Sequence, residues 1–145
     1  MLTLAGLDHI VLRTTQRAAM LTFYCEVLGC QIERERPELG LTQLRAGNAL
    51  IDLVDVDSEL GKLGGQAPQQ NGRNLDHFCL QYHPQSEEAI LQYLASFGFH
   101  EITFANRYGA QGYGRSLYIN DPEHNVVELK PYLPSSSPVN ANETA

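Results

Sequence analysis

A six-residue motif that occurs twice constrains the fold of this 145-residue chain more than any other feature. Residues 7–12 read Leu-Asp-His-Ile-Val-Leu, and residues 75–80, which lie 68 positions further on, read Leu-Asp-His-Phe-Cys-Leu. Both copies have the composition of a short strand, and each carries a histidine, His9 or His77, at the equivalent position. The repeat predicts two similar modules and, at the paired histidines, a metal site.

The order of the predicted elements repeats as well. Each half is predicted to contain one strand, one helix that ends at a glycine, and three further strands. The expected strands and helix are 7–13, 16–28, 30–36, 41–46 and 49–56 in the first half, and 75–82, 86–97, 99–105, 116–120 and 125–130 in the second. We therefore expect an α+β fold in which two paired βαβββ modules form a cupped mixed sheet.

Composition gives the module boundaries. The first module is predicted at 5–56 and the second at 75–131, because the segment 57–74 between them is rich in Gly, Gln, Asn and Pro and has no apolar periodicity, which is typical of a linker. The Ser- and Pro-rich residues 132–145 are predicted to be a disordered tail. A second glycine-rich stretch, 109–116, is predicted to be a mobile loop over a pocket.

Charge and hydropathy exclude several classes of protein. The formal net charge is −7 and the ten Lys and Arg residues are scattered, so nucleic acid is not an expected partner. No segment approaches the roughly 20 apolar residues that span a membrane, and the N-terminus lacks a signal-peptide pattern, so we expect a cytoplasmic protein. The three cysteines form no Cys-x-x-Cys pair, which indicates free thiols in a reducing compartment.

Two acidic residues complete the predicted site. Asp52 and Glu128 lie in the last strand of their modules, each between two apolar residues. Because alternate side chains of a strand share a face, both carboxylates are expected on the concave face when their neighbours face the core. His9 with Asp52 and His77 with Glu128 then form a four-group site. Imidazole and carboxylate ligands suit a divalent ion such as Zn, Ni, Co, Fe or Mn.

Cys25 and the three histidines outside the repeated motif are expected to be structural or surface residues. Cys25 could act as a nucleophile, but no base lies near it in the sequence, which favours a core thiol. His83, His100 and His124 fall at a strand end, near a helix stop and in a turn.

The chain resembles the vicinal oxygen chelate superfamily, which includes glyoxalase I, fosfomycin-resistance proteins, extradiol dioxygenases and bleomycin-resistance proteins. The resemblance covers residues 5–131. It rests on the two Leu-Asp-His copies, on Phe-Tyr-x-x-x-Leu-Gly at 23–29 and on Tyr-x-x-Asp-Pro-x-x-Asn-x-x-Glu at 118–128. These motifs are specific to the superfamily and not to one member.

The resemblance implies paired βαβββ modules around a divalent metal, usually in a homodimer, with ligand roles for His9, His77, Glu128 and Asp52. It implies a glyoxalase-like lyase or isomerase that binds two adjacent oxygen atoms of a small-molecule substrate and stabilises an enediolate. Glu128 and Asp52 would move the proton, and glutathione is a candidate co-substrate. Asp52 stands where glyoxalase I has glutamate, and His124 stands where the turn usually has glycine.

Several alternatives stay open within this resemblance. Tyr118, ten residues before Glu128, also fits an Fe(II) ring-cleaving dioxygenase and is a candidate catalytic residue. That signature places a further histidine shortly before the tyrosine, and residues 105–117 contain none. Gly-Arg-Ser-x-Tyr at 114–118 is shared with fosfomycin-type thiol transferases. A non-catalytic binding or resistance protein is the third alternative. The modules could pair within one chain or exchange between two chains.

Overall fold

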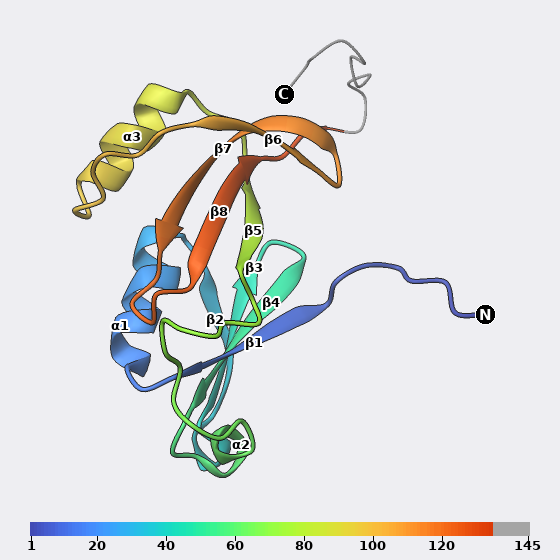
Figure 1. Cartoon of the computed structure of the whole chain (residues 1–145), viewed down its shortest axis with the longest axis vertical. Coiled ribbons are helices and arrows are strands. Elements are labelled where there is room, and N and C mark those ends of the chain that lie inside the picture. Colours follow the sequence, from blue (N-terminus) through green and yellow to red (C-terminus); the bar gives the residue numbers. More distant parts are fainter. Residues whose placement is uncertain (135–145) are drawn as a thin grey trace. The chain divides into compact units, whose positions relative to one another are not determined.

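The computed structural model describes residues 1–134 and divides into two compact units (Figure 1). The first unit comprises residues 1–73 together with 122–124, and the second holds the other described residues. Of the predicted tail, 135–145 lies outside the described residues. Among residues 1–134, no helix is long and apolar enough to cross a lipid bilayer.

The first unit is a four-stranded mixed sheet with helical segments. Its strands follow the order β1-β4-β3-β2, with β1 parallel to β4 and the other neighbours antiparallel. The elements are β1 (His9–Thr14), α1 (Arg17–Leu21), the π-helical segment η1 (Thr22–Val27), β2 (Gln31–Arg36), the short 3-10 helix η2 (Pro37–Leu39), β3 (Leu41–Ala46), β4 (Ala49–Asp55) and α2 (Glu59–Lys62).

Apolar residues from the helical stretch and from one face of the sheet form the core of this unit. α1 and η1 form the single helical stretch that the spacing predicts, and its last turns are widened by a hydrogen bond from the Leu28 amide to the Phe23 carbonyl at 3.1 Å. The buried side chains include Met20, Phe23, Tyr24, Val27, Leu44, Ile51 and Leu53. Burying the odd-numbered β4 residues Ile51 and Leu53 directs Asp52 to the opposite face of the sheet.

The second unit repeats the architecture, with strand order β5-β8-β7-β6 and β5 parallel to β8. Its elements are β5 (His77–Tyr82), α3 (Glu87–Ala95), β6 (Ala105–Gly109), β7 (Gly112–Asn120) and β8 (Val126–Pro131). Ser86 caps α3 by accepting a hydrogen bond from the Ala89 amide at 3.1 Å. The predicted α+β fold with two βαβββ modules is confirmed.

Two expectations for the second unit are wrong. The strand expected at 99–105 is instead β6, which begins where that segment ends, and the left-handed backbone of Glu101, with φ of 58°, interrupts an extended conformation there. The expected mobile loop at 109–116 is a tight β-hairpin. Gly109 pairs with Gly112 across a two-residue turn, and Gly112 has a φ of 93° that glycine adopts readily.

The segment predicted as a linker contains the short helix α2. Ser58 caps it by accepting from the Gly61 amide at 2.9 Å, and the Arg13 guanidinium donates hydrogen bonds to carbonyls at its end. These acceptors are the carbonyl oxygens of Gly61, Gly64, Gly65 and Gln66, at 2.6–3.1 Å. The first part of the linker is therefore fixed against β1.

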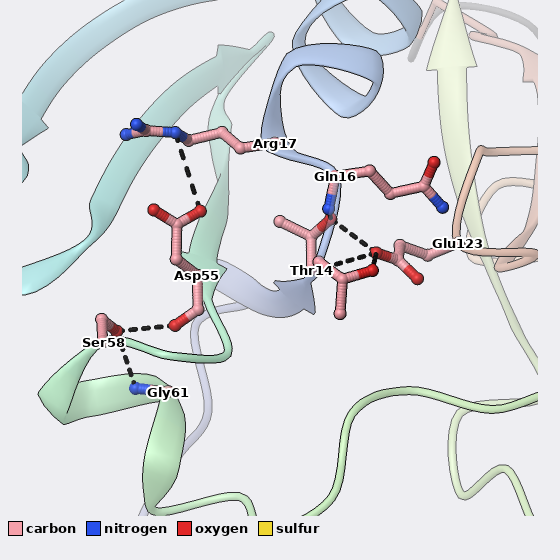
Figure 2. Close-up of polar contacts among 8 residues, drawn as sticks. Thr14, Gln16, Arg17, Asp55, Ser58, Gly61 and Glu123 are labelled. Atoms are coloured by element: carbon pink, nitrogen blue, oxygen red, sulfur yellow. Dashed lines mark hydrogen bonds and ion pairs between the residues drawn. The ribbon is translucent and has the colours of Figure 1, made fainter.

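A buried carboxylate holds the start of the first helix, as Figure 2 shows. The Glu123 Oε1 atom accepts from the Thr14 hydroxyl at 2.7 Å, the Thr15 amide at 2.6 Å and the Thr15 hydroxyl at 3.1 Å. Burial opposes ionisation of Glu123, but these hydrogen bonds outweigh it and lower the pKa of the carboxyl group. The segment 122–124 thus belongs with the first unit although β7 and β8, which flank it, do not.

Candidate metal-binding site

His77 and Glu128 lie together on one face of the second sheet. The Nε2 atom of His77 lies 3.2 Å from the Oε2 atom of Glu128. On its other side, the Nδ1 atom of His77 lies 2.7 Å from a carboxylate oxygen of Asp76. Glu128 is buried, whereas the His77 side chain is partly open to solvent. This pair places one imidazole nitrogen and one carboxylate oxygen next to each other, so that both could bind one ligand ion.

His9 and Asp52 form the corresponding pair of the first unit. β1 and β4 are in parallel register, with His9 beside Leu50 and Val11 beside Asp52, so both side chains lie on the face opposite the core. The Asp52 Oδ2 atom accepts from the Gln43 amide group at 3.0 Å, but its Oδ1 atom is buried and has no hydrogen-bond partner among residues 1–134. Gln43 was not among the predicted site residues. Its register position beside Asp52 becomes visible only once β3 and β4 are paired.

The aspartates of the repeated motif also take part, which the sequence reasoning missed. A carboxylate oxygen of Asp8 lies 2.6 Å from the Nδ1 atom of His9, and one of Asp76 lies 2.7 Å from the Nδ1 atom of His77. A carboxylate on one ring nitrogen fixes the tautomer and leaves the other nitrogen for a ligand, which is the usual outer-shell arrangement of metal-binding histidines. The signal was present in the sequence, since an Asp precedes the His in both copies.

The charges around His9 favour its protonated form. The hydrogen bond with Asp8 raises the pKa of the imidazole, slight desolvation opposes this, and the negative charge of Asp52 raises it further. A divalent cation between the same carboxylate and the imidazole nitrogen would replace that proton.

Substituting the aspartate next to His77 tests this arrangement. We expect Asp76→Ala to lower divalent-metal affinity about 10- to 100-fold, because the imidazole loses its orienting carboxylate but remains a ligand. Competition with a fluorescent chelator measures the affinity. Asp57→Ala, which removes an exposed aspartate of the linker, is the control and should leave it unchanged. Equal affinity of the Asp76→Ala variant and the parent chain would contradict the role.

Tyr118 and Cys79 line the same face of the second sheet as Glu128. Tyr118 pairs with Glu128 across β7 and β8, its ring packs edge-on against His77 at 5.7 Å between centroids, and its hydroxyl accepts from the Arg107 Nε atom at 3.1 Å. Partial burial and the charge of Glu128 raise the pKa of the Cys79 thiol to about 11, although Lys130 opposes this. Cys79 is therefore a neutral thiol and not a nucleophile at neutral pH.

The other two cysteines are equally unreactive. Burial raises the pKa of the Cys25 thiol, and it raises that of Cys30 to about 11. The sequence-based preference for a core thiol at Cys25 agrees with its partly buried position.

Comparison with known proteins identifies the family of this chain. The profile of the Glyoxalase/Bleomycin resistance protein/Dioxygenase superfamily matches residues 6–129. The chain belongs to this superfamily. The resemblance derived from the repeated motif is thereby confirmed for nearly the whole described chain. A search of curated proteins found no match.

Several solved structures have a fold similar to that of this chain. The integron cassette protein VCH_CASS1 of V. cholerae is 23% identical with a TM-score of 0.66, over 92% of this chain and 99% of that one. A lactoylglutathione lyase from Agrobacterium tumefaciens is 21% identical with a TM-score of 0.62, over 89% and 95%. A mutant of the fosfomycin resistance protein FosX from Listeria monocytogenes, complexed with Mn(II) and 1S,2S-dihydroxypropylphosphonic acid, is 16% identical with a TM-score of 0.62, over 90% and 94%.

The donor atoms in this glyoxalase-superfamily chain fit a divalent metal. Each unit supplies one imidazole nitrogen and one carboxylate, and the buried Asp52 Oδ1 atom lacks the hydrogen bond that a buried carboxylate oxygen normally has. Within residues 1–134, no group of three or more His, Cys, Asp or Glu side chains has metal-binding geometry. Within each unit, the structure places one predicted histidine and one predicted carboxylate on the same sheet face, His9 with Asp52 and His77 with Glu128.

Proposed function

We propose that this protein is a divalent-metal-dependent lyase or isomerase of the glyoxalase type that acts on a small molecule with oxygen atoms on adjacent carbons. The observation that carries the proposal is the pair formed by His77 and Glu128, in which the aspartate-bound imidazole directs its free nitrogen to a buried carboxylate at 3.2 Å. In the first unit, Asp8 likewise contacts the His9 imidazole, and the buried carboxylate of Asp52 lies on the same sheet face as His9.

We propose His9, Asp52, His77 and Glu128 as the metal ligands. Two neutral imidazoles and two carboxylates are the ligand types that Zn, Ni, Co, Mn and Fe accept. Asp8, Asp76 and Gln43 orient three of these groups by hydrogen bonds. A metal held there would act as a Lewis acid that stabilises negative charge on a substrate oxygen.

The proton transfer is proposed for Glu128, with Asp52 as the second carboxylate. A general base must lie within hydrogen-bond reach of the proton that it removes, and both carboxylates lie on the sheet face of the histidine in their own unit. Glu128 is 7% exposed and Asp52 is 4% exposed. Tyr118, with its hydroxyl held by Arg107 and its ring against His77, would orient the substrate oxygen.

The proposal is tested on purified protein reconstituted with Zn, Ni, Mn or Fe(II). We expect close to one ion per set of four ligands by elemental analysis, and turnover of the hemithioacetal of glutathione and a 2-oxoaldehyde, followed by absorbance of the thioester product. Absence of bound metal after reconstitution, with no rise in thermal stability, would contradict the metal site. Light scattering reports whether the chain is the homodimer that we also propose.

Two further substrates separate the alternatives in the same experiment. A catechol under oxygen tests the dioxygenase alternative, which the place of Tyr118 opposite Glu128 favours. Fosfomycin with a thiol tests the epoxide-opening alternative. Metal binding without turnover of any of the three substrates would contradict the glyoxalase-type reaction and favour a binding protein.

A further inference from the structure

A lysine and a serine lie buried on the same sheet face as Glu128, and the proposed metal site does not use either of them. Lys130 is two residues beyond Glu128 on β8, so its side chain leaves the sheet on the same side. Tyr118 pairs with Glu128 and Leu117 with Leu129, so one further step in this antiparallel register places Ser116 opposite Lys130. Lys130 is 4% exposed and Ser116 is 0% exposed.

The hydrogen bonds of these two groups are incomplete. The Lys130 ammonium has three N–H donors, and its recorded hydrogen bond among residues 1–134 goes to the carbonyl oxygen of Gly112. The Ser116 hydroxyl is buried with no hydrogen-bond partner in the described part of the chain. Leaving further N–H donors of a buried ammonium and a buried hydroxyl without acceptors is costly, so the fold retains both groups at a cost in stability.

The glycine-rich hairpin makes room for the lysine. A Cβ atom on Gly114 would lie 2.8 Å from the Lys130 Cε atom, and one on Gly109 would lie 2.9 Å from its Nζ atom. The Lys130 side chain therefore runs from β8 toward the hairpin of β6 and β7. It occupies space that is free because Gly109 and Gly114 have no side chain. This assigns a role to the glycine pattern of 109–114 beyond forming the turn.

We propose that Lys130 and Ser116 bind an oxyanion substituent, a carboxylate or a phosphonate, of the substrate; this inference rests on the proposed function. Such a group supplies acceptors for the free ammonium donors and for the serine hydroxyl, and hydrogen bonds between charged partners are the stronger kind. The substrate would then extend along β8, with its vicinal oxygens at Glu128 and its anionic end at Lys130.

The test uses ¹⁵N-labelled full-length protein, freed of metal with a chelator, titrated with acetate in one arm and methylphosphonate in the other. We expect saturable shifts of the Gly112 and Ser116 amide signals with at least one of these anions, and the tighter arm identifies the substituent. Lys130→Met, which keeps the length of the side chain without its charge, should weaken that binding about tenfold or more.

Two further variants make the result specific. Ser116→Ala removes a buried hydroxyl that has no partner among residues 1–134, so it should not lower thermal stability while weakening anion binding several-fold. Arg115→Met removes a cation from the opposite face of β7, where Arg115 pairs with Glu87 at 2.8 Å, and should leave anion binding unchanged. The inference would be overturned by amide shifts that do not saturate with either anion. It would also be overturned if the Lys130→Met and Ser116→Ala variants both bound the anion as tightly as the parent chain.

Elemental analysis separates this inference from the proposed function. Lys130→Met leaves all four proposed ligands in place, so it should retain the metal of the parent chain. Retained metal with unchanged anion binding would refute the oxyanion site alone. A parent chain that binds no metal would refute the proposed function, whatever the outcome of the anion titration.

Discussion

Replacing His77 with alanine is expected to weaken divalent-metal binding by at least about 100-fold, since loss of a group that merely orients a ligand already costs about 10- to 100-fold. At a free metal concentration 100 times its dissociation constant, binding adds about 2.7 kcal/mol to the free energy of unfolding. With affinity lowered 100-fold, the same concentration adds only about 0.4 kcal/mol. The metal-dependent rise in the unfolding midpoint should therefore nearly disappear, and turnover with it.

The matched control for this prediction is His83→Ala. His83 lies just beyond β5 in the same unit and packs edge-on against Tyr132, with 6.5 Å between ring centroids. Its replacement should leave metal content and the metal-dependent stabilisation unchanged. A His77→Ala variant that is stabilised by metal as strongly as the parent chain would exclude His77 as a ligand.

The repeat and the strand alternation were sufficient to predict the two modules and the face on which each proposed ligand lies. These properties depend on local patterns of two to four residues, which the sequence displays directly. Asp52 is an example, because burial of Ile51 and Leu53 determines where its side chain points. The contacts of Asp8 and Asp76 with the histidines could have been predicted in the same way, because an aspartate precedes the histidine in both copies of the motif, but the predicted site did not include them.

Other features depend on pairing between distant residues. The strand expected at 99–105 was misplaced because its apolar residues resemble a strand, while β6 (Ala105–Gly109) is held by its hairpin partner β7. Lys130 and Ser116 become neighbours only through the register of β7 and β8. Burial of a lysine opposite a serine is a tertiary property that local propensity does not encode.

The buried carboxylate of Glu123 gives the second large expected effect. Glu123→Ala should lower the free energy of unfolding at pH 7 by roughly 2–3 kcal/mol, because it removes a charged acceptor from the Thr14 hydroxyl and from the Thr15 amide and hydroxyl. The Thr15 amide lies just before the N-cap residue Gln16 of α1, and a part-buried donor that loses its acceptor is costly. Urea unfolding monitored by circular dichroism measures the change.

The pH dependence of this effect follows from the sign of the pKa shift. The pKa of Glu123 is lower in the folded chain than in the unfolded chain, so its contribution is fully present above the unfolded value of about 4.3 and is lost as the pH falls through the lower folded value. The difference in stability between the parent chain and the Glu123→Gln variant should therefore shrink as the pH is lowered from 5 toward 3.

A surface carboxylate provides the comparison. Glu33 pairs with Arg45 at 2.6 Å on the exposed side of β2 and β3, where solvent screens the ion pair. Glu33→Gln should leave the urea midpoint at pH 7 close to that of the parent chain. If Glu33→Gln and Glu123→Ala lowered the urea midpoint equally, the Glu123 hydrogen bonds would stabilise the fold no more than a surface ion pair does. The attachment of segment 122–124 to the start of the first helical stretch would then need another cause.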